Sequence, residues 1–267
     1  MKWTQEQIDL LKHEWPTATT EQLLLKFPNR TYKAISEKAR KLNISANNCR
    51  KKKGDLSFLE LTSLTKETAY WWGFIMADGH LSKRGTLCIA LEENDLEYLN
   101  QLAVKLGVVP KLYLHKNSNK KLATISVTNI NIVKHWFSIL KMTDTAKTYF
   151  PPDLSLFLNK EWLIYFLIGF IDGDGCLTLS HTKEKGIRKN ITINSHISWY
   201  NNWVNIKNKC REYYNINVNC SVTNRGYVKI GIYDINSHII LLNHLIQLPY
   251  MQRKWNKFIE YYSERKI

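Results

Sequence analysis

Two nine-residue segments of the chain follow the same pattern. Residues 71–79 read WWGFIMADG and residues 167–175 read LIGFIDGDG. Each segment is an apolar run that contains a glycine and ends in a small residue, an aspartate and a glycine. The two final aspartates, Asp78 and Asp174, are 96 positions apart, so the duplicated unit has the size of a small domain. Two such segments can pack together and bring two carboxylates to one point, which is the minimum needed to bind a divalent metal ion.

The composition and charge indicate a folded protein with a polyanionic partner. The chain has 267 residues, of which 44% are apolar and 12% aromatic, so it can bury a substantial core as one large domain or as two or three small ones. These fractions argue against intrinsic disorder. The net charge of +15 favours an acidic partner, and nucleic acid is the commonest one.

The cysteines and the apolar runs argue against secretion and membrane insertion. The five cysteines are widely spaced and form no C-x-x-C pair, so neither a disulfide framework nor a zinc knuckle is expected. The longest apolar stretch, residues 162–171, is shorter than the roughly 18 residues that span a bilayer. The N-terminus lacks the apolar core of a signal peptide. We expect a soluble intracellular protein in the cytoplasm or nucleoid, with an organelle left open and no membrane partner.

The N-terminal fifth of the chain has the features of a separate, basic module. Residues 1–53 carry a net charge of +7 and end in a basic run, which suits a linker that follows phosphates. Thr4, Thr20 and Thr31 can each cap a short helix, because apolar residues repeat at helical spacing after each of them. Three short helices, the last of them basic, are typical of a helix-turn-helix. A helical bundle that only docks on the rest of the chain is the alternative.

The remainder of the chain divides into two similar halves, residues 54–152 and 153–267. After the first acidic segment, strands and helices alternate over residues 86–91, 94–106, 111–116, 121–128 and 130–140. After the second, they alternate over residues 190–194, 199–213, 217–223, 227–233, 235–246 and 252–263. We therefore predict an α+β fold in which the order αββαββα occurs twice. Each antiparallel sheet should have one apolar face against helices and one polar face exposed.

The spacing of small residues predicts that the two acidic segments are closely packed helices. Gly73 lies one helical turn before Ala77, and Gly169 lies one turn before Gly173. Small residues at this spacing let two helix backbones approach closely.

The ends of these two helices predict a metal site. Gly79 and Gly175 are expected to end the helices in a left-handed conformation. Asp78 and Asp174 would then lie at the C-terminal ends, where the helix dipole disfavours each carboxylate by ~0.3–1 kcal/mol. The two charges would also repel each other, so a cation between them is expected, either Mg²⁺ or another divalent ion such as Mn²⁺. Ordinary helix ends beside a turn are the alternative.

The two nine-residue segments resemble the LAGLIDADG motif of homing endonucleases, and the resemblance covers about residues 56–267. It implies a pseudo-symmetric saddle over double-stranded DNA, built by a monomer that carries both motifs. By position, Asp78 and Asp174 correspond to the catalytic, metal-binding acids, with Gly79 and Gly175 beside them in the metal site. Met76 departs from the first aspartate of the motif.

The resemblance also implies a basic residue late in each half, near the scissile phosphates. Lys147 and Lys254 occupy comparable positions, and either could stabilise the charge that develops on a phosphoryl group. Solvated surface lysines are the alternative in a lysine-rich chain. Glu93 and His196, at the ends of the second strands, are candidates for orienting water.

DNA contacts are expected on the polar faces of the strands, because a two-stranded ribbon fits the major groove. The candidates in the two later halves are Lys83, Arg84, Thr178, Ser180, Thr182, Lys183, Lys185, Arg188, Lys189, Thr192, Asn194 and Lys229. Those in the N-terminal module and its linker are Lys33, Arg40, Lys41, Arg50, Lys51, Lys52 and Lys53.

The N-terminal module itself has a second resemblance. Over about residues 2–45, the positions of Trp3, Trp15, Leu24, Phe27 and the helical face that follows Arg30 resemble Myb/SANT-like DNA-binding domains. The module is therefore expected to add DNA affinity.

Together these features favour a site-specific, metal-dependent endonuclease that makes double-strand breaks in a long, asymmetric DNA target. Two alternatives share the same fold. One is an intron maturase, which binds RNA and assists splicing, and the other is a DNA-binding regulator that has lost cleavage. A pure binding protein has no use for two carboxylates at helix C-termini, which argues against the regulator.

Overall fold

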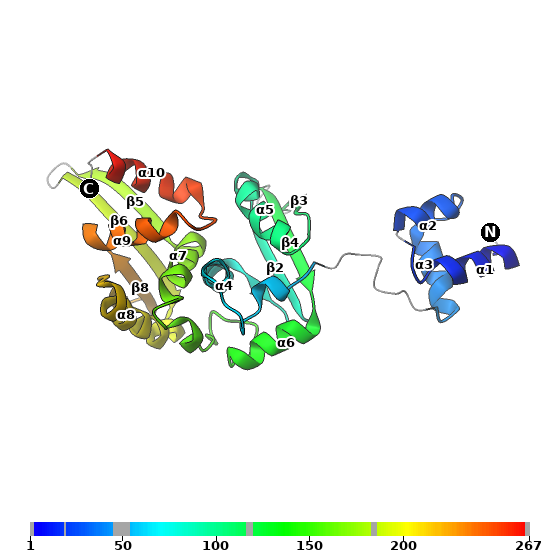
Figure 1. Cartoon of the computed structure of the whole chain (residues 1–267), viewed down its shortest axis with the longest axis horizontal. Helices are drawn as coiled ribbons and strands as arrows, with labels where there is room; N and C mark the ends of the chain where they lie inside the picture. Colours follow the sequence, from blue (N-terminus) through cyan, green and yellow to red (C-terminus); the bar gives the residue numbers. More distant parts are fainter. Residues whose placement is uncertain (1–2, 19, 45–53, 116–119, 183–185, 265–267) are drawn as a thin grey trace. The chain divides into compact units, whose positions relative to one another are not determined.

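The structure is a computed structural model and describes residues 3–18, 20–44, 54–115, 120–182 and 186–264. The chain divides into two compact units, Met1–Lys53 and Gly54–Ile267 (Figure 1). Each unit buries its own cluster of apolar side chains.

Three short helices form the first unit. They are α1 (Gln5–Glu14), α2 (Thr20–Lys26) and α3 (Tyr32–Lys41). The Thr4 side chain caps α1 by accepting a hydrogen bond from the Gln7 N–H, and Thr31 caps α3 by accepting one from the Ala34 N–H. The expected cap at Thr20 is wrong, because Thr20 is itself the first residue of α2. The helices share one buried cluster, made of Leu11, Trp15, Ala18, Leu23, Phe27, Ile35 and Ala39.

The second unit contains the two predicted repeats. The first repeat consists of α4 (Lys66–Asp78), β1 (His80–Leu81), β2 (Thr86–Glu92), α5 (Leu96–Lys105), β3 (Lys111–Leu114), β4 (Lys121–Thr128) and α6 (Ile130–Ile139). The second consists of α7 (Leu163–Asp174), β5 (Cys176–Thr182), β6 (Gly186–His196), α8 (Tyr200–Tyr214), β7 (Asn219–Val222), β8 (Tyr227–Ile232) and α9 (Ile235–Leu245). A further helix, α10 (Gln252–Ser263), follows the second repeat. The predicted order αββαββα is confirmed in both.

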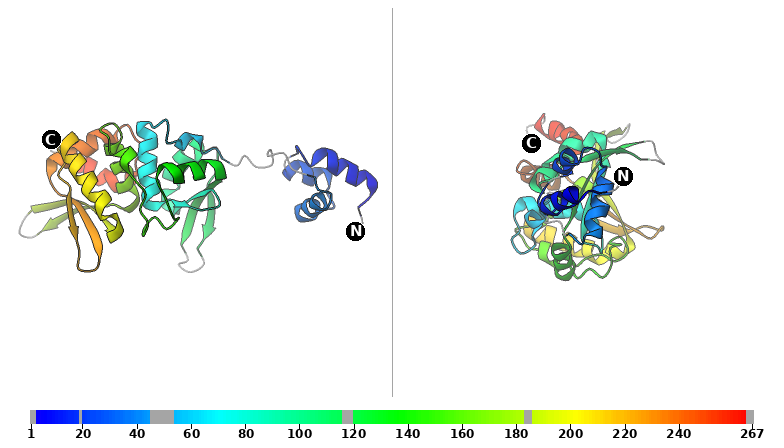
Figure 2. Two further views of the ribbon diagram at one scale, coloured as in Figure 1. Left: turned by 90° about the horizontal axis from the view of Figure 1, so that it is seen from below. Right: turned by 90° about the vertical axis from the view of Figure 1, so that its right-hand side faces the viewer.

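Each repeat forms one four-stranded antiparallel sheet. The strand order is β1-β2-β4-β3 in the first repeat and β5-β6-β8-β7 in the second. Burial alternates along β2, where Leu87, Ile89 and Leu91 are buried and Ala90 and Glu92 are exposed. Figure 2 shows the strands of both sheets extending from the same side of this unit, with helices on the other side. Each sheet therefore keeps one polar face free of helices.

The first hairpins of the two repeats differ in length. The hairpin of the second repeat pairs a seven-residue strand, β5, with an eleven-residue strand, β6. In the first repeat, β1 has only two residues and a tight turn leads directly into β2. Gly85 closes this turn with a φ of 80°, and a Cβ there would lie 2.3 Å from the Ile130 Cα. The sequence predicted a ribbon at this place in both repeats, and the structure has an extended one only in the second.

Helices α4 and α7 pack against each other at the centre of the second unit (Figure 1). A Cβ on Gly73 would lie 1.9 Å from the carbonyl oxygen of Phe166, and a Cβ on Gly169 would lie 1.9 Å from that of Tyr70. The two helix backbones are therefore in direct contact at these glycines, as the spacing predicted. This contact, called the helix seam below, joins the two repeats.

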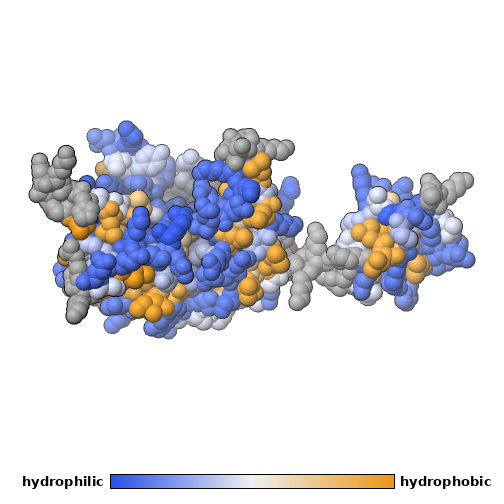
Figure 3. All heavy atoms as spheres, turned by 90° about the horizontal axis from the view of Figure 1, so that it is seen from above, coloured by the Kyte–Doolittle hydropathy of each residue, from blue (hydrophilic) through white to orange (hydrophobic). Residues whose placement is uncertain are grey.

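The described part of the chain contains no helix of the length and apolarity that a membrane crossing requires. Figure 3 shows hydrophilic and apolar residues interspersed over the displayed face of the second unit.

Candidate active site at the helix seam

The two repeated aspartates are the last residues of the seam helices. Asp78 ends α4 and Asp174 ends α7, and both side chains are exposed. The next N–H in the chain donates a hydrogen bond to the carbonyl of Ile75 at 3.0 Å in α4, and to that of Ile171 at 2.8 Å in α7. Both carboxylates therefore lie at helix C-termini, as predicted.

The glycines that follow the aspartates are needed for close packing and not for a left-handed turn. Gly79 has φ −74° and Gly175 has φ −76°, so the prediction of left-handed helix ends is wrong. A Cβ on Gly79 would lie 2.7 Å from the carbonyl oxygen of Ile75, and a Cβ on Gly175 would lie 2.4 Å from that of Ile171. The chain turns over the last helical turn so tightly that only hydrogen fits at these positions.

One lysine ammonium lies against the C-terminal carbonyls of each seam helix. Lys147 Nζ donates to the carbonyl oxygens of Met76 and Ala77, both at 2.6 Å. Lys254 Nζ lies within hydrogen-bond distance of four carbonyl oxygens of the other helix end, which its three N–H groups share: Ile171 at 3.3 Å, Asp172 at 2.5 Å, Gly173 at 2.7 Å and Gly175 at 2.9 Å. A cation is favourable at a helix C-terminus, because it offsets the negative end of the dipole. The lysines thus balance the carboxylates at the same helix ends.

The carboxylates and the lysines perturb one another. The pKa of Asp78 is raised, mainly because packed atoms remove part of its hydration and then because the Asp174 charge is near. Loss of hydration also raises the pKa of Asp174, while the two lysines oppose the rise. Burial lowers the pKa of Lys147 to about 8 against the attraction of both aspartates, and it lowers the pKa of Lys254 as well. These four groups form one electrostatic cluster.

Asp172, the other acid of the second motif, is buried and holds the two repeats together. Its carboxylate accepts hydrogen bonds from the Tyr70 hydroxyl at 2.6 Å, from Trp255 Nε1 at 2.6 Å and from the Met251 N–H at 3.0 Å. Burial raises its pKa to about 6, although the three donors act in the opposite direction. Met76 occupies the matching position of α4 and is also buried. The difference between the two motifs is therefore a buried one.

A small cavity of about 90 Å³ opens beside one of the two aspartates. Its lining includes Asp174, Lys147, and two residues of β6, Asn194 and His196. The structure therefore brings the water-orienting candidate of the second repeat next to the acid and the lysine. Its counterpart Glu93 lies in the short helical turn after β2 and forms an ion pair with Lys121 at 3.6 Å.

The donor groups at the seam suit a hard divalent cation. Asp78 and Asp174 offer carboxylate oxygens, which Mg²⁺ prefers. A cation would favour their charged forms against the partial loss of hydration that raises both pKa values and against the Asp174 charge that further raises the pKa of Asp78. The described residues hold no cluster of three or more His, Cys, Asp or Glu side chains that could bind an ion by themselves. Water and substrate oxygens would have to complete the coordination. Of the two glycines predicted beside the metal, Gly175 has its carbonyl oxygen bonded to Lys254.

Most predicted DNA-contacting residues of the second repeat share one sheet face. The strand register places these on the face of the exposed Asn194: Thr178, Ser180, Arg188, Thr192 and Lys229. Lys189 lies on the opposite face, where its ammonium is 5.3 Å from the Tyr261 ring of α10. These candidates lie outside the described residues: Arg50, Lys51, Lys52, Lys53, Lys183 and Lys185, together with the side chain of Thr182.

The remaining DNA-contacting candidates are exposed. Lys83 and Arg84 lie in the tight turn after β1, and Lys83 forms an ion pair with Asp144 at 3.1 Å. In the first unit, the exposed side chains on α3 include Lys33, Arg40 and Lys41, whereas Ile35 and Ala39 of the same helix are buried.

Sequence reasoning missed three residues that hold the two lysine segments in place. Trp199 Nε1 donates to the carbonyl oxygen of Lys147 at 2.9 Å. Arg253, which precedes Lys254, forms a two-point ion pair with Asp95. The position of Arg253 beside the predicted lysine was a signal for one of the three, and the sequence held no comparable signal for the others.

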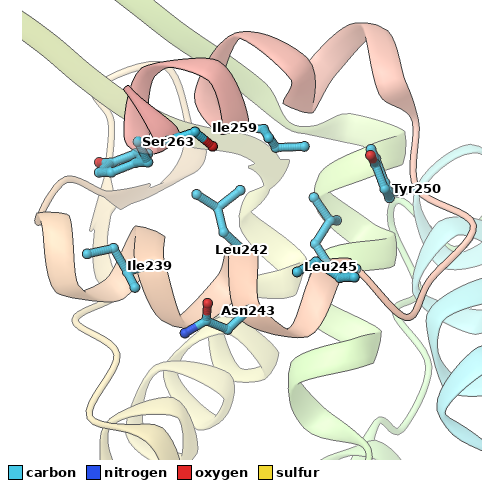
Figure 4. Close-up of a pocket in the computed structure, with 9 residues that line it drawn as sticks. Ile239, Leu242, Asn243, Leu245, Tyr250, Ile259 and Ser263 are labelled. Carbon is cyan, nitrogen blue, oxygen red and sulfur yellow. The ribbon is translucent and has the colours of Figure 1, made fainter. Parts of the chain in front are cut away.

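A larger cavity of about 300 Å³ lies between α9 and α10. Figure 4 shows that Leu242 and Leu245 of α9 and Ile259 of α10 contribute to its lining. Among the described residues, no acidic or basic side chain lines it, so these residues offer no group for phosphoryl chemistry.

Comparison with known proteins agrees with this architecture. Residues 167–264 match a family model described as LAGLIDADG endonuclease. The homing endonuclease I-WcaI, solved bound to its DNA recognition sequence, is similar in structure with 16% identity and a TM-score of 0.53, over 76% of this chain and 91% of that chain. The LAGLIDADG meganuclease I-AabMI, solved bound to uncleaved DNA, matches with 14% identity and a TM-score of 0.50, over 76% of this chain and 92% of that chain.

Full-length DUF199/WhiA from Thermatoga maritima matches with 18% identity and a TM-score of 0.47, over 80% of this chain and 67% of that chain. No curated protein matches the chain. The sheet topology, the helix seam and the matches to the two endonuclease structures show that the chain has the LAGLIDADG fold.

Proposed function

We propose that this protein is a homing endonuclease that makes metal-dependent double-strand breaks at a specific site in a long, asymmetric DNA target. The observation that carries the proposal is the cluster at the seam, where each helix ends in an aspartate and holds one lysine ammonium on its last carbonyls. A structural role alone does not explain two carboxylates at helix C-termini, because the dipole and their mutual repulsion both oppose them.

Asp78 and Asp174 would hold the divalent ion, together with the backbone oxygen of Gly79 and oxygens of water and DNA. A divalent cation supplies two things when it is bound there: it makes water a better nucleophile near neutral pH, and it offsets the charge of the phosphodiester. The lysine ammonium groups lie at the same helix ends and would stabilise the charge that develops on the phosphoryl oxygens. His196 and Asn194, which line the cavity beside Asp174, would orient water on that side.

The polar sheet faces would read the target. In the second repeat, the long ribbon of β5 and β6 presents Ser180, Arg188, Thr192 and Asn194 on one face, beside Lys229 of the neighbouring strand β8, and this arrangement fits recognition in a major groove. The first repeat has only a tight turn at the corresponding place, so the two half-sites should differ in length and in sequence. One chain supplies both seam helices, which supports a monomer.

The first unit would act as a helix-turn-helix domain that adds affinity. Its last helix presents Lys33, Arg40 and Lys41 to solvent. Residues 1–53 contribute a net charge of +7, and contacts between such residues and phosphates strengthen binding at low salt.

The decisive experiment is cleavage of a plasmid library of random targets in Mg²⁺ and in EDTA, followed by rate measurements on the recovered site. Asp78→Asn and Asp174→Asn should each lower the cleavage rate by about 100-fold or more while DNA binding is retained. Glu97→Gln, on the exposed side of α5, is the matched control. The proposed site is wrong if both aspartate variants cut as well as the wild type.

Binding without cleavage would identify one of the two alternatives. A wild-type protein that binds duplex DNA but does not cut it in any divalent ion would be a DNA-binding regulator. A protein that prefers folded intron RNA over DNA, and promotes its splicing, would be a maturase.

A further inference from the structure

The segment that carries Lys147 is attached to the opposite repeat. Lys147 follows α6 and its ammonium lies on the end of α4, so both belong to the first repeat. Its backbone carbonyl, however, accepts a 2.9 Å hydrogen bond from Trp199 Nε1, and the next carbonyl, of Thr148, accepts a 2.6 Å hydrogen bond from Ser198 Oγ. Ser198 and Trp199 lie in the short helical turn η5 (Ile197–Trp199) of the second repeat.

The segment that carries Lys254 is attached in the reverse direction. Lys254 lies in α10, which follows the second repeat, and its ammonium lies on the end of α7. The preceding residue, Arg253, donates to both oxygens of Asp95, from Nε at 2.5 Å and from a terminal nitrogen at 2.8 Å. Asp95 is 4% exposed and lies in the short helical turn η3 (Glu93–Asp95) of the first repeat.

The two attachments occupy the same place in the repeat. Turn η3 follows β2, and turn η5 follows β6. Asp95 and Trp199 are the last residues of these turns, and both are buried. Each turn therefore holds the lysine segment of the opposite repeat, although one uses a charged pair and the other a neutral hydrogen bond.

This crossed arrangement can control where each ammonium lies. A lysine side chain has four rotatable bonds, so its ammonium stays on the helix carbonyls only if the backbone of its segment is fixed. The backbone of Lys147 is held through Trp199, and the Arg253 ion pair ties the first turn of α10, which carries Lys254, to the first repeat. A two-point ion pair with a buried carboxylate is geometrically specific, and the loss of one partner leaves the other unpaired.

We propose that Asp95 and Trp199 are positioning residues, each of which sets the placement of the site lysine of the opposite repeat and so controls cleavage of one DNA strand. The placement of the lysines stands on the contacts above. The effect on strand cleavage rests on the proposed function.

The placement is tested without any cleavage, by the rate at which a dilute acylating reagent modifies Lys147 and Lys254 in the full-length protein, measured by peptide mass spectrometry. Asp95→Asn should raise the modification rate of Lys254 about threefold or more and leave Lys147 within twofold of the wild type. Trp199→Phe should do the reverse. Asn94→Ala in η3 and Ile197→Val in η5 are exposed neighbours that should change neither rate.

Second variants at each attachment guard against loss of folding. Arg253→Lys keeps the charge but removes the two-point geometry, and Ser198→Ala removes the bond to Thr148 together with the 3.0 Å contact of Ser198 Oγ with His196 Nδ1, while leaving the Trp199 bond to Lys147 in place. Arg253→Lys should raise the modification rate of Lys254 less than Asp95→Asn does, and Ser198→Ala should raise that of Lys147 less than Trp199→Phe does. Both variants should unfold at a temperature close to that of the wild type. Equal changes at both lysines, or no change at either, would overturn the proposal.

Cleavage of a plasmid carrying the target, with each strand labelled at one end, then tests the effect on the strands. Asp95→Asn and Trp199→Phe should each slow one strand about tenfold, and the slowed strand should differ between the two variants, so that nicked plasmid accumulates. One outcome is that the wild type cuts no DNA while Asp95→Asn still exposes Lys254 and Trp199→Phe still exposes Lys147 to the acylating reagent. That result would refute the proposed endonuclease function but support the role of Asp95 and Trp199 in placing the lysines. Cleavage by the wild type with equal slowing of both strands in the variants would refute the positioning of each lysine by the opposite repeat.

Discussion

The hydroxyl of Tyr70 donates a 2.6 Å hydrogen bond to the carboxylate of Asp172. Tyr70 belongs to α4 and Asp172 to α7, so this bond crosses the helix seam and joins the repeats. Both side chains are fully buried, and the Tyr70 oxygen is also 2.8 Å from the Tyr98 hydroxyl. The seam thus combines backbone contact at its glycines with a buried polar network.

Removal of the Tyr70 hydroxyl should destabilise the second unit. Tyr70→Phe leaves a buried carboxylate with one donor fewer, which costs about 1–3 kcal/mol of unfolding free energy. Urea denaturation followed by tryptophan fluorescence measures the loss. The control is Tyr113→Phe, whose ring on β3 is 43% exposed and which should change stability little. Equal stability of the two variants would contradict a role for this bond.

The stability of the protein should depend on pH through Asp172. Its pKa is raised to about 6 in the folded protein, above the ordinary value of 3.8 for an aspartate, so the folded state holds this proton more tightly than the unfolded state. The stabilisation of the folded state by protonated Asp172 is fully present below about pH 4 and is lost as the pH rises through about 6. The wild type should therefore lose stability across this window relative to Asp172→Asn, which does not titrate. Denaturation curves for both proteins from pH 4 to 7 give the difference, and a constant difference would contradict the burial of an ionisable group.

The seam should not accept a side chain at its glycines. Gly73→Ala or Gly169→Ala places a Cβ 1.9 Å from a backbone carbonyl oxygen, so the helices must move apart. Moving the two helix backbones apart should lower the free energy of unfolding by more than about 3 kcal/mol. We therefore expect only a small fraction of the second unit to be folded in these variants. Gln101→Ala, at an exposed position of α5, is the control. Circular dichroism and thermal unfolding of the three variants test this expectation. A seam variant as stable as the control would mean that the two helices are farther apart than the contacts at Gly73 and Gly169 indicate.

Cleavage should weaken at alkaline pH as Lys147 loses its charge. Its pKa is lowered to about 8, so the ammonium is present below this pH and absent well above it. If the charge acts on the phosphoryl group, the rate for one strand should fall about tenfold for each pH unit above the pKa. Lys147→Arg stays charged and should lose this alkaline limb, whereas Lys134→Arg on α6 should keep it. Nicking rates from pH 6.5 to 9.5 measure both profiles, and identical profiles in the two variants would exclude a role for the Lys147 charge.

Deletion of residues 1–53 should weaken DNA binding without abolishing cleavage. The second unit has its own core and contains both seam helices, so it should remain folded. The removed residues carry a net charge of +7, and the slope of log affinity against log salt should decrease by about 0.9 for each lost phosphate contact. Fluorescence anisotropy at several salt concentrations gives this slope. An unchanged slope would show that the first unit does not contact DNA.

Much of the architecture could be predicted because it depends on local patterns. The alternation of apolar residues along β2 and their helical spacing in α5 predicted these elements to within a few residues of their observed ends. The capping residues Thr4 and Thr31 act over three positions of the chain and were also predictable. The prediction of left-handed helix ends at Gly79 and Gly175 was wrong. The sequence shows where glycine is required but not which contact requires it.

The amino-acid sequence by itself determined the duplicated αββαββα order, the pairing of two helices through small residues, and the two aspartates at their ends, because each depends on spacing within a short segment. Only the tertiary structure decided which lysine faces which helix end, that Lys189 lies on the opposite sheet face from its neighbours, and that Asp95 and Trp199 hold segments of the opposite repeat. These features join residues 50 to 160 positions apart, and such contacts are set by how the two repeats pack and leave no periodic trace in the chain.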